Sequence, residues 1–312
     1  MAIKAYKGFK KDMTCRGFQY EEGKEYETDK AEVCETGFHA CEYPLDCFSY
    51  YAPSESVFRE VEQDGEISRK GDDTKLASTK IKIGAKLNIA GLVKAAIEYT
   101  SSRTKKEAGS ESDCGVSSAT GDYGASSATG NCGASSATGN CGASSATGYK
   151  GASSATGDYG ASSATGNCGA SSATGNCGAS SATGYKGVSS ATGNYGASSA
   201  TGYKGVSSAT GDYGASSATG NCGASSATGY KGVSSAEDKD SIAVAWGYHG
   251  KAKGVIGSYL VLADWEGDED NYWTQELWTL KGAKMVRVDG DNIKEDTFYT
   301  MRNGEIVECK EE

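Results

Sequence analysis

Four side chains that could bind a soft metal ion fall within fourteen residues near the start of the chain: Cys34, His39, Cys41 and Cys47. Thiolate and imidazole groups are the usual ligands of structural zinc, and four of them complete a tetrahedral site. The spacing matches no common zinc knuckle or ribbon, and Cys47 lies in an expected helix among apolar neighbours. Because small buried cysteines are common in protein cores, we expect no metal here and keep zinc as an alternative.

Three short segments combine aromatic residues with Lys, His or Gly: Tyr6–Gly8, Gly37–His39 and Phe48–Tyr51. Their order resembles that of ADP-ribosyltransferases, in which an early aromatic-basic-Gly or His-Gly turn and a later aromatic helix grip the nicotinamide cofactor. The Arg or His of that first motif is Lys7 here, and no catalytic Glu can be placed. The resemblance implies a nucleotide-binding N-terminal domain, with or without catalysis, and this is one alternative function.

No other set of residues indicates catalysis. His249, one of only two histidines, lies in the Gly-rich aromatic turn Trp246–Gly250, which is typical of a structural turn. The chain has no Gly-x-Ser-x-Gly nucleophile elbow and no phosphate loop ending in Gly-Lys-Ser/Thr. We therefore predict a protein without catalytic residues or a cofactor.

The centre of the chain is a nine-residue repeat, Gly-x-x-Gly-Ala-Ser-Ser-Ala-Thr, in residues 113–236. The triplet Ser-Ser-Ala occurs fourteen times, always nine residues after the previous copy. A fixed short period predicts a solenoid, in which each unit buries its inner face against its neighbours. Ala-Ser-Ser-Ala-Thr is suited to a strand, and Gly-x-x-Gly to a turn.

The variable turn residues indicate the size of the coil. As the last variable residue of a turn, Tyr is confined to alternate turns, and Lys is confined to the others except at the final unit. This parity predicts a parallel β-roll of about 18 residues per coil, with two strands and two unlike edges. The Tyr-bearing edge is the predicted contact stripe, because aromatic residues dominate interface energetics. Its members are Tyr123, Tyr159, Tyr195 and Tyr213.

The inner face of the coil can be either of two alternating sets. One set is represented by Ser126 and Ala128, the other by Ala125, Ser127 and Thr129. Val replaces the first Ala of four units, so that position tolerates bulk, and we favour the Ser126 and Ala128 set as the interior. Buried Ser hydroxyls must then bond to the backbone or to one another.

The calcium-binding β-roll has a nonapeptide repeat as well, but it needs an Asp in each unit. An acidic residue occupies only 4 of the 14 turns here, so we predict no calcium in the repeat. The regular outward Ser and Thr residues suggest a second alternative function, binding to ice or to another crystal surface.

The flanks are expected to form small domains with cores of their own. Residues 1–86 read as an α+β domain and 87–112 as a capping helix with a polar linker. Residues 113–236 form the solenoid, and 237–312 contain one or two irregular last coils and a β-rich cap. Asn303-Gly304 is a strong hairpin signal, whereas Glu22-Gly23 and Asp64-Gly65 indicate turns. The fold class is mainly β.

Charge argues against nucleic acid as a partner. The whole chain carries 31 Lys+Arg against 41 Asp+Glu, a net charge of −10. The repeat has four of each, which gives 0, and residues 237–312 have 9 against 17, which gives −8. With no concentrated basic patch, no apolar run near ~20 residues and no leader pattern at Met1, we expect a cytoplasmic protein that binds neither nucleic acid nor membrane.

Two further resemblances bear on function. The small-residue repeat is similar to the β-roll heads of trimeric autotransporter adhesins. The segments Ala5–Phe9, Cys15–Tyr20 and Gly37–Cys41 resemble uncharacterised proteins of Gram-positive bacteria, their phages and prophages. The resulting hypothesis is a non-enzymatic β-solenoid scaffold or binding protein. A phage-encoded form would act in the host cytosol, where a host protein could be its partner and be inhibited by it; a homo-oligomer is left open.

Overall fold

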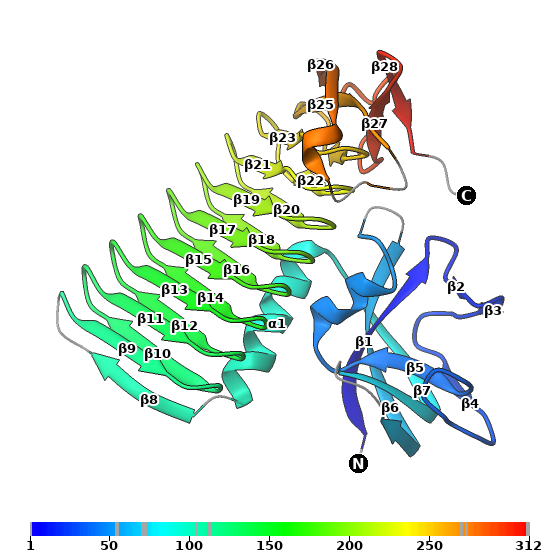
Figure 1. The fold of residues 1–312 in the computed structure, drawn as a ribbon, viewed down its shortest axis with the longest axis vertical. Coiled ribbons are helices and arrows are strands. Elements are labelled where there is room, and N and C mark those ends of the chain that lie inside the picture. The colour runs from blue at the N-terminus through cyan, green and yellow to red at the C-terminus, as the bar shows by residue number, and fades with distance from the viewer. Residues whose placement is uncertain are drawn as a thin grey trace. The chain divides into compact units, whose positions relative to one another are not determined.

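The computed structural model describes residues 2–53, 56–69, 74–103, 105–110, 114–268, 271 and 274–309. Contacts divide the chain into two units, residues 1–96 and 97–310, with the boundary inside helix α1 (Ile89–Arg103). The helix expected within residues 87–112 corresponds to α1, and its role as a cap stays a prediction. Each unit is described by itself (Figure 1).

The N-terminal unit is built on one antiparallel sheet with the order β4-β7-β5-β1-β6. A further pairing between β7 and β6 closes β7, β5, β1 and β6 into a ring. Its core contains Phe9, Val61, Ile81 and Ile83, because alternate residues of each strand face inward. The strands are β1 (Ile3–Lys10), β4 (Glu25–Glu27), β5 (Phe38–Cys41), β6 (Ser56–Arg69) and β7 (Lys75–Leu87), with a separate hairpin of β2 (Thr14–Cys15) and β3 (Phe18–Gln19).

Two local predictions in this unit can be compared with the structure, and one of them is wrong. Asp64-Gly65 does not end a strand: β6 runs through it, and its register against β7 shifts between Asp64 and Ile67. Gly65 has a φ of +79°, so its conformational freedom serves a bulge within the strand. The helix expected around Cys47 is present as the 3₁₀ helix η1 (Pro44–Ser49), which has Pro in its first turn.

The second unit contains the predicted parallel β-solenoid. Ala125 pairs with Ala143 and Ala134 with Ala152, so the coil repeats every eighteen residues, with one strand in each of two sheets. Figure 1 shows these strands stacked as successive coils. The β9 sheet contains β9 (Val116–Thr120), β11 (Ala134–Thr138), β13 (Ala152–Thr156), β15 (Ala170–Thr174), β17 (Val188–Thr192), β19 (Val206–Thr210), β21 (Ala224–Ala227), β23 (Ile242–Ala245) and β25 (Tyr259–Glu266). The β10 sheet contains β8 (Lys105–Ser110), β10 (Gly124–Thr129), β12 (Ala143–Thr147), β14 (Ala161–Thr165), β16 (Ala179–Thr183), β18 (Ala197–Thr201), β20 (Ala215–Thr219), β22 (Val233–Ala236) and β24 (Lys251–Gly254).

The interior is the favoured Ser126 and Ala128 set. Ser126 is 3% exposed and Ala128 is fully buried, whereas Val116 in the first strand position is 77% exposed. Each inward Ser hydroxyl donates to the inward Ser nine residues earlier at about 3 Å, for example Ser171 to Ser162 at 2.9 Å. Nine residues is half a coil, so this hydroxyl ladder crosses between the two sheets at every step. It runs from Ser117 to Ser234 and satisfies the hydroxyls of the inward Ser positions, as predicted.

The turns need glycine because successive coils stack closely. Gly202 has a φ of +139°, and a Cβ on it would collide with the carbonyl oxygen of Gly184 in the preceding coil. Its backbone N–H donates to the carbonyl of Thr219 in the next coil at 2.9 Å. The first glycine of each turn therefore fixes the spacing between coils.

The solenoid extends beyond the exact repeat at both ends. Residues 105–110 lie within the expected linker, but they form β8, which pairs in parallel with β10. After residue 236, β23, β24 and β25 continue the parallel pairing of the coils. Here the inward Ser positions become Ala243, Ala252 and Leu260, and the hydroxyl ladder gives way to an apolar cluster that includes Leu262 and Tyr299.

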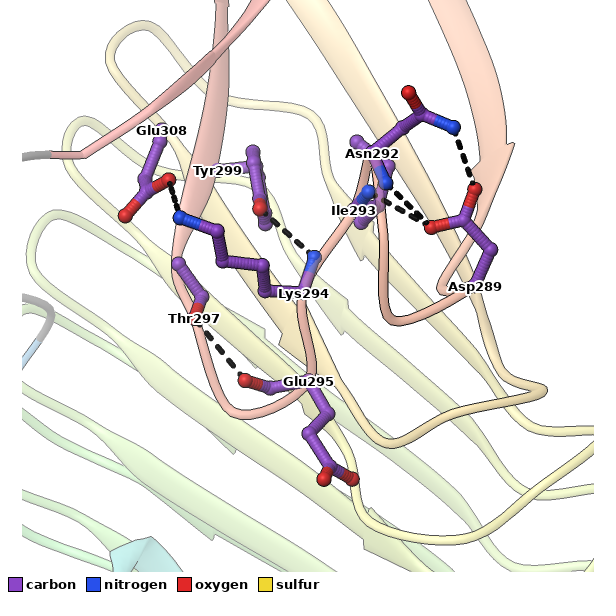
Figure 2. A network of polar contacts seen from close by, with 8 residues as sticks. All are labelled: Asp289, Asn292, Ile293, Lys294, Glu295, Thr297, Tyr299 and Glu308. Carbon is purple, nitrogen blue, oxygen red and sulfur yellow. Dashed lines mark hydrogen bonds and ion pairs between the residues drawn. The ribbon is translucent and has the colours of Figure 1, made fainter.

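Antiparallel strands end the second unit: β26 (Thr279–Arg287) pairs with β25, and β27 (Tyr299–Arg302) with β24 and β28 (Glu305–Glu308). Asn303 and Gly304 both have positive φ, as the predicted tight hairpin requires. Figure 2 shows the loop before β27, where Asp289 Oδ1 accepts the backbone N–H groups of Asn292 and Ile293, each at 2.9 Å. Within the described residues, no helix is long and apolar enough to cross a bilayer.

Candidate functional site

The N-terminal unit contains a cavity of about 630 Å³. The three segments predicted to hold a nucleotide, Tyr6–Gly8, Gly37–His39 and Phe48–Tyr51, all contribute to its wall. They come from β1, from the start of β5 and from the end of η1, which the sheet order brings together. A Cβ at Gly8 would lie 2.5 Å from the Tyr51 ring, so the small residue at this position lets the aromatic ring pack against β1.

Lys7 is the most unusual group in the wall of the cavity. Its side chain is 5% exposed, and Nζ donates to the carbonyl oxygen of His39 at 2.7 Å. Nζ also lies 5.4 Å from the centre of the Phe9 ring and 5.8 Å from that of Tyr20, within cation–π range. No carboxylate of the described residues forms an ion pair with it. A buried ammonium without a counter-ion is costly, so the site is electrostatically suited to an anion.

Further positive groups lie around the same cavity. Arg16 and Lys75 both contribute to its wall. Lys75 Nζ donates to the Tyr50 hydroxyl at 2.9 Å and lies 4.5 Å from the centre of that ring. Glu27 and Glu35 also line the cavity, and Glu27 pairs with Lys80 on the exposed surface. The arrangement combines aromatic walls with three cations, which suits a planar ligand that carries negative charge.

His39 is held as a neutral imidazole. Nδ1 bonds to the carbonyl of Gly37 at 3.1 Å and is therefore the protonated nitrogen, while Nε2 accepts the backbone N–H of Cys34 at 3.0 Å. Burial, and next the positive charge of Lys7, lower the pKa of His39 below its ordinary value. Both ring nitrogens are occupied by the backbone, so this side chain positions the loop before β5.

The four zinc candidates, Cys34, His39, Cys41 and Cys47, all line this cavity. They do not converge: no group of three potential metal ligands occurs within the described residues. Cys47 is buried and its thiol donates to the carbonyl oxygen of Tyr6 at 3.2 Å. A zinc ion would have to replace that contact and one of the two backbone contacts of His39.

A thiol–phenol contact at the cavity could not be found from sequence. The Cys15 sulfur lies 2.8 Å from the Tyr51 hydroxyl, although the two residues are 36 positions apart. Burial, followed by this hydrogen bond, raises the pKa of Tyr51. The hairpin that carries Cys15 and the end of η1 that carries Tyr51 meet through tertiary packing, which leaves no short-range spacing signal.

The predicted tyrosine stripe lies on one edge of the solenoid, in the turns that lead from the β9 sheet to the β10 sheet. Tyr123 is 55% exposed, whereas Tyr159, Tyr195 and Tyr213 are half-buried. Tyr195 and Tyr213 stack with their ring centres 5.4 Å apart. The contacts continue through Tyr230, Tyr248 and Trp278 into the cap. Much of this stripe therefore serves packing within the solenoid.

The opposite edge carries tyrosines that are more exposed. Tyr149, Tyr185 and Tyr203 are 54%, 50% and 43% exposed, in turns that lead from the β10 sheet to the β9 sheet. They occupy the first variable position of their turns, whereas the tyrosines of the predicted stripe occupy the last variable position. The signal available in the sequence was the dipeptide Tyr-Lys, which occupies each of these three turns.

Comparison with known proteins gives a partial match. Residues 3–95 match a family model described as a domain of unknown function (DUF7666). The matched segment coincides closely with the N-terminal unit, which contains the cavity, and spans under a third of the 312-residue chain. No curated protein and no solved structure matches the chain.

Proposed function

We propose that this chain is a non-enzymatic binding protein, in which the N-terminal domain holds a small anionic ligand and the β-solenoid is a rigid scaffold. One observation carries the proposal: the Lys7 ammonium is buried in the cavity wall, and no carboxylate among the described residues pairs with it. A bound anion would supply the missing charge. The aromatic side chains of the wall would cover the apolar part of the ligand.

Thermal-shift and calorimetric titration of the full chain test the proposal. The probes are inorganic phosphate, AMP, ADP-ribose and NAD, each at pH 7.5. We expect at least one organic anion to raise the unfolding temperature of the native chain, and Lys7→Met to abolish that shift. Lys30→Met is the matched control, because Lys30 is 71% exposed and pairs with Glu32 outside the cavity. Binding of the same probes to Lys7→Met with unchanged affinity would contradict the proposal.

A second candidate is an enzyme similar to ADP-ribosyltransferases. It is supported by the convergence of the three resembling segments on one cavity, and by Glu27 and Glu35, which supply carboxylates there. Incubation with NAD, followed by chromatography for free nicotinamide, separates the two candidates. Release of nicotinamide that is lost in Lys7→Met favours the enzyme, and binding without release favours the non-enzymatic protein.

A protein partner for the scaffold is part of the same proposal. If a phage carries the gene, that partner belongs to the host, and the chain acts as its inhibitor. On the predicted stripe, Tyr123 is the member that is most open to such a contact. Proteins that copurify with the native chain but not with Tyr123→Ser would support this role, and their equal recovery would count against the stripe.

The crystal-surface alternative rests on the outward residues of the β9 sheet. Thr138, Thr156 and Thr174 are exposed and in register along successive coils. Such flat hydroxyl rows could match a crystal lattice. Purified protein without measurable thermal hysteresis would remove ice as the target.

A further inference from the structure

The edge of the solenoid that leads from the β10 sheet to the β9 sheet forms a distinct surface. We call the turns Tyr149-Lys150, Tyr185-Lys186 and Tyr203-Lys204 the Tyr-Lys edge. All six side chains are exposed. The other described turns on this edge between residues 130 and 223 contain Asn and Cys, at 131–132, 167–168 and 221–222.

Two of the three tyrosine rings on the Tyr-Lys edge stack on each other. Tyr185 and Tyr203 stack face to face, with ring centres 5.2 Å apart and an interplanar angle of 12°. Lys186 Nζ lies 6.0 Å from the centre of the Tyr185 ring, and Lys204 Nζ lies 5.6 Å from that of Tyr203. One face of each ring is thus engaged in the stack, and an ammonium group lies within about 6 Å of each ring centre.

Among the described turns that lead from the β10 sheet to the β9 sheet, carboxylates occur only at Glu237, Asp238 and Asp240, beyond the three Tyr-Lys turns. Lys150, Lys186 and Lys204 form no ion pair with any described carboxylate, and the other variable residues of the six turns between residues 130 and 223 are uncharged. The edge is therefore a row of three ammonium groups on a chain whose net charge is −10. Its ammonium groups and phenol hydroxyls are hydrogen-bond donors that suit an anion.

We propose that the Tyr-Lys edge binds an extended acidic segment of a partner protein. Carboxylates would pair with the lysines and accept hydrogen bonds from the tyrosine hydroxyls. Coils about 4.8 Å apart place Lys186 and Lys204 one step apart and Lys150 two steps before Lys186, over a length of roughly 14 Å. About four to five residues of extended chain span that length. The Tyr185–Tyr203 stack already occupies one face of each ring, which leaves less ring surface for the stacking of nucleobases or sugars.

The chain itself supplies matched variants, because Asn-Cys turns occupy the same edge. Tyr185→Asn with Lys186→Cys, and Tyr203→Asn with Lys204→Cys, convert two turns to the sequence of Asn167-Cys168 and are expected to fold. Asn167→Tyr with Cys168→Lys adds a fourth Tyr-Lys turn. Tyr123→Ser, on the opposite edge, is the control for a general loss of exposed aromatic surface.

The measurement is fluorescence anisotropy of a labelled eight-residue poly-Glu peptide at low salt, with eight-residue oligothymidylate as the competing probe. Exposed ion pairs predict about a threefold change in affinity for each turn. We expect about tenfold weaker binding on loss of two turns, about threefold tighter binding on gain of one, and no change in Tyr123→Ser. Added salt should weaken binding.

Absence of poly-Glu binding, or binding that stays the same in the loss and gain variants, would overturn the proposal. Tighter binding of oligothymidylate, with the same dependence on these turns, would overturn it in favour of single-stranded nucleic acid. The surface lies outside the N-terminal cavity, and poly-Glu binding should survive Lys7→Met. The two proposals can therefore fail independently.

Discussion

At the scale of single residues, His39 makes the stability of the N-terminal unit depend on pH. Its neutral Nε2 accepts the Cys34 N–H, and burial with nearby positive charge lowers its pKa in the folded protein below the ordinary value of 6.5. The unfolded chain therefore binds more protons than the folded chain as the pH falls below about 6.5. This contribution to stability is complete above that pH and is lost as the pH falls through the folded-state pKa.

Urea unfolding at pH 7.5 and pH 5.0 measures this effect. We expect the native chain to lose stability between the two values, and His39→Gln to lose less, because Gln cannot take up a proton. Since other groups also titrate in this range, the quantity that matters is the difference between the two pH dependences. Equal dependences in the two proteins would show that His39 is not the group responsible.

Sequence spacing identified some members of the cavity and missed others for a physical reason. The segments containing Lys7 and His39 carry a local pattern of aromatic, basic and glycine residues. Cys15, Arg16 and Lys75 belong to no such local pattern. The β2–β3 hairpin brings Cys15 and Arg16 to the cavity, and the start of β7 brings Lys75. Strand order and register decide such contacts, and neither can be read from a single non-repetitive segment.

At the scale of secondary-structure elements, the hydroxyl ladder holds the two sheets of the solenoid together. Ser171→Ala removes one hydroxyl from the middle, so Ser180 loses its acceptor and Ser162 its donor. We expect a loss of about 1–3 kcal/mol in the free energy of unfolding, the usual cost of leaving buried polar groups unsatisfied. Ser172→Ala, on the outward face of the same strand, should change it by less than about 0.5 kcal/mol. Equal effects in denaturant titrations would argue against the ladder.

The two glycines of one turn should differ in their tolerance of a side chain. Gly202→Ala places a Cβ against the backbone of Gly184, at a φ that L-residues rarely adopt. The backbones of residues 184 and 202 cannot move apart without separating two adjacent coils. We expect a loss of about 3 kcal/mol or more from strain and overpacking. At Gly205 the nearest atom would be the Ala200 Cβ at 3.2 Å, so Gly205→Ala should cost clearly less. Thermal unfolding of the two variants compares them directly.

Repetition explains why the solenoid was predictable and the flanking strands less so. Each position of the nine-residue repeat is sampled fourteen times, so substitutions such as Val116 and Val188 reveal the outward face statistically. The non-repetitive strands offer one sample per position. Asp64-Gly65 therefore read as a turn, although glycine at positive φ serves a bulge equally well.

At the scale of the whole molecule, the second unit is continuous from solenoid to cap. Aromatic contacts run from Tyr195 and Tyr213 through Tyr230 and Tyr248 to Trp278. Backbone pairing continues through β23 into β25 without a break. We therefore expect the repeat and its C-terminal cap to unfold together, because no boundary in packing separates them.

The N-terminal unit has its own core and should unfold in a separate transition. Ile83 lies fully buried in that core, and Leu260 lies fully buried in the cap of the second unit. Replacement of either by Ala should lower the free energy of unfolding of its own unit by about 2–5 kcal/mol. The two losses should therefore appear in different unfolding transitions. All four tryptophans lie between residues 246 and 278, so tryptophan fluorescence reports only the second unit.

Leu260→Ala should therefore move the fluorescence midpoint in guanidinium to lower concentration, whereas Ile83→Ala should leave it in place. Circular dichroism, which reports both units, should register both changes. A fluorescence midpoint that shifts equally in the two variants would mean that the chain unfolds as one cooperative body. In that case a ligand bound in the N-terminal cavity would stabilise the solenoid as well.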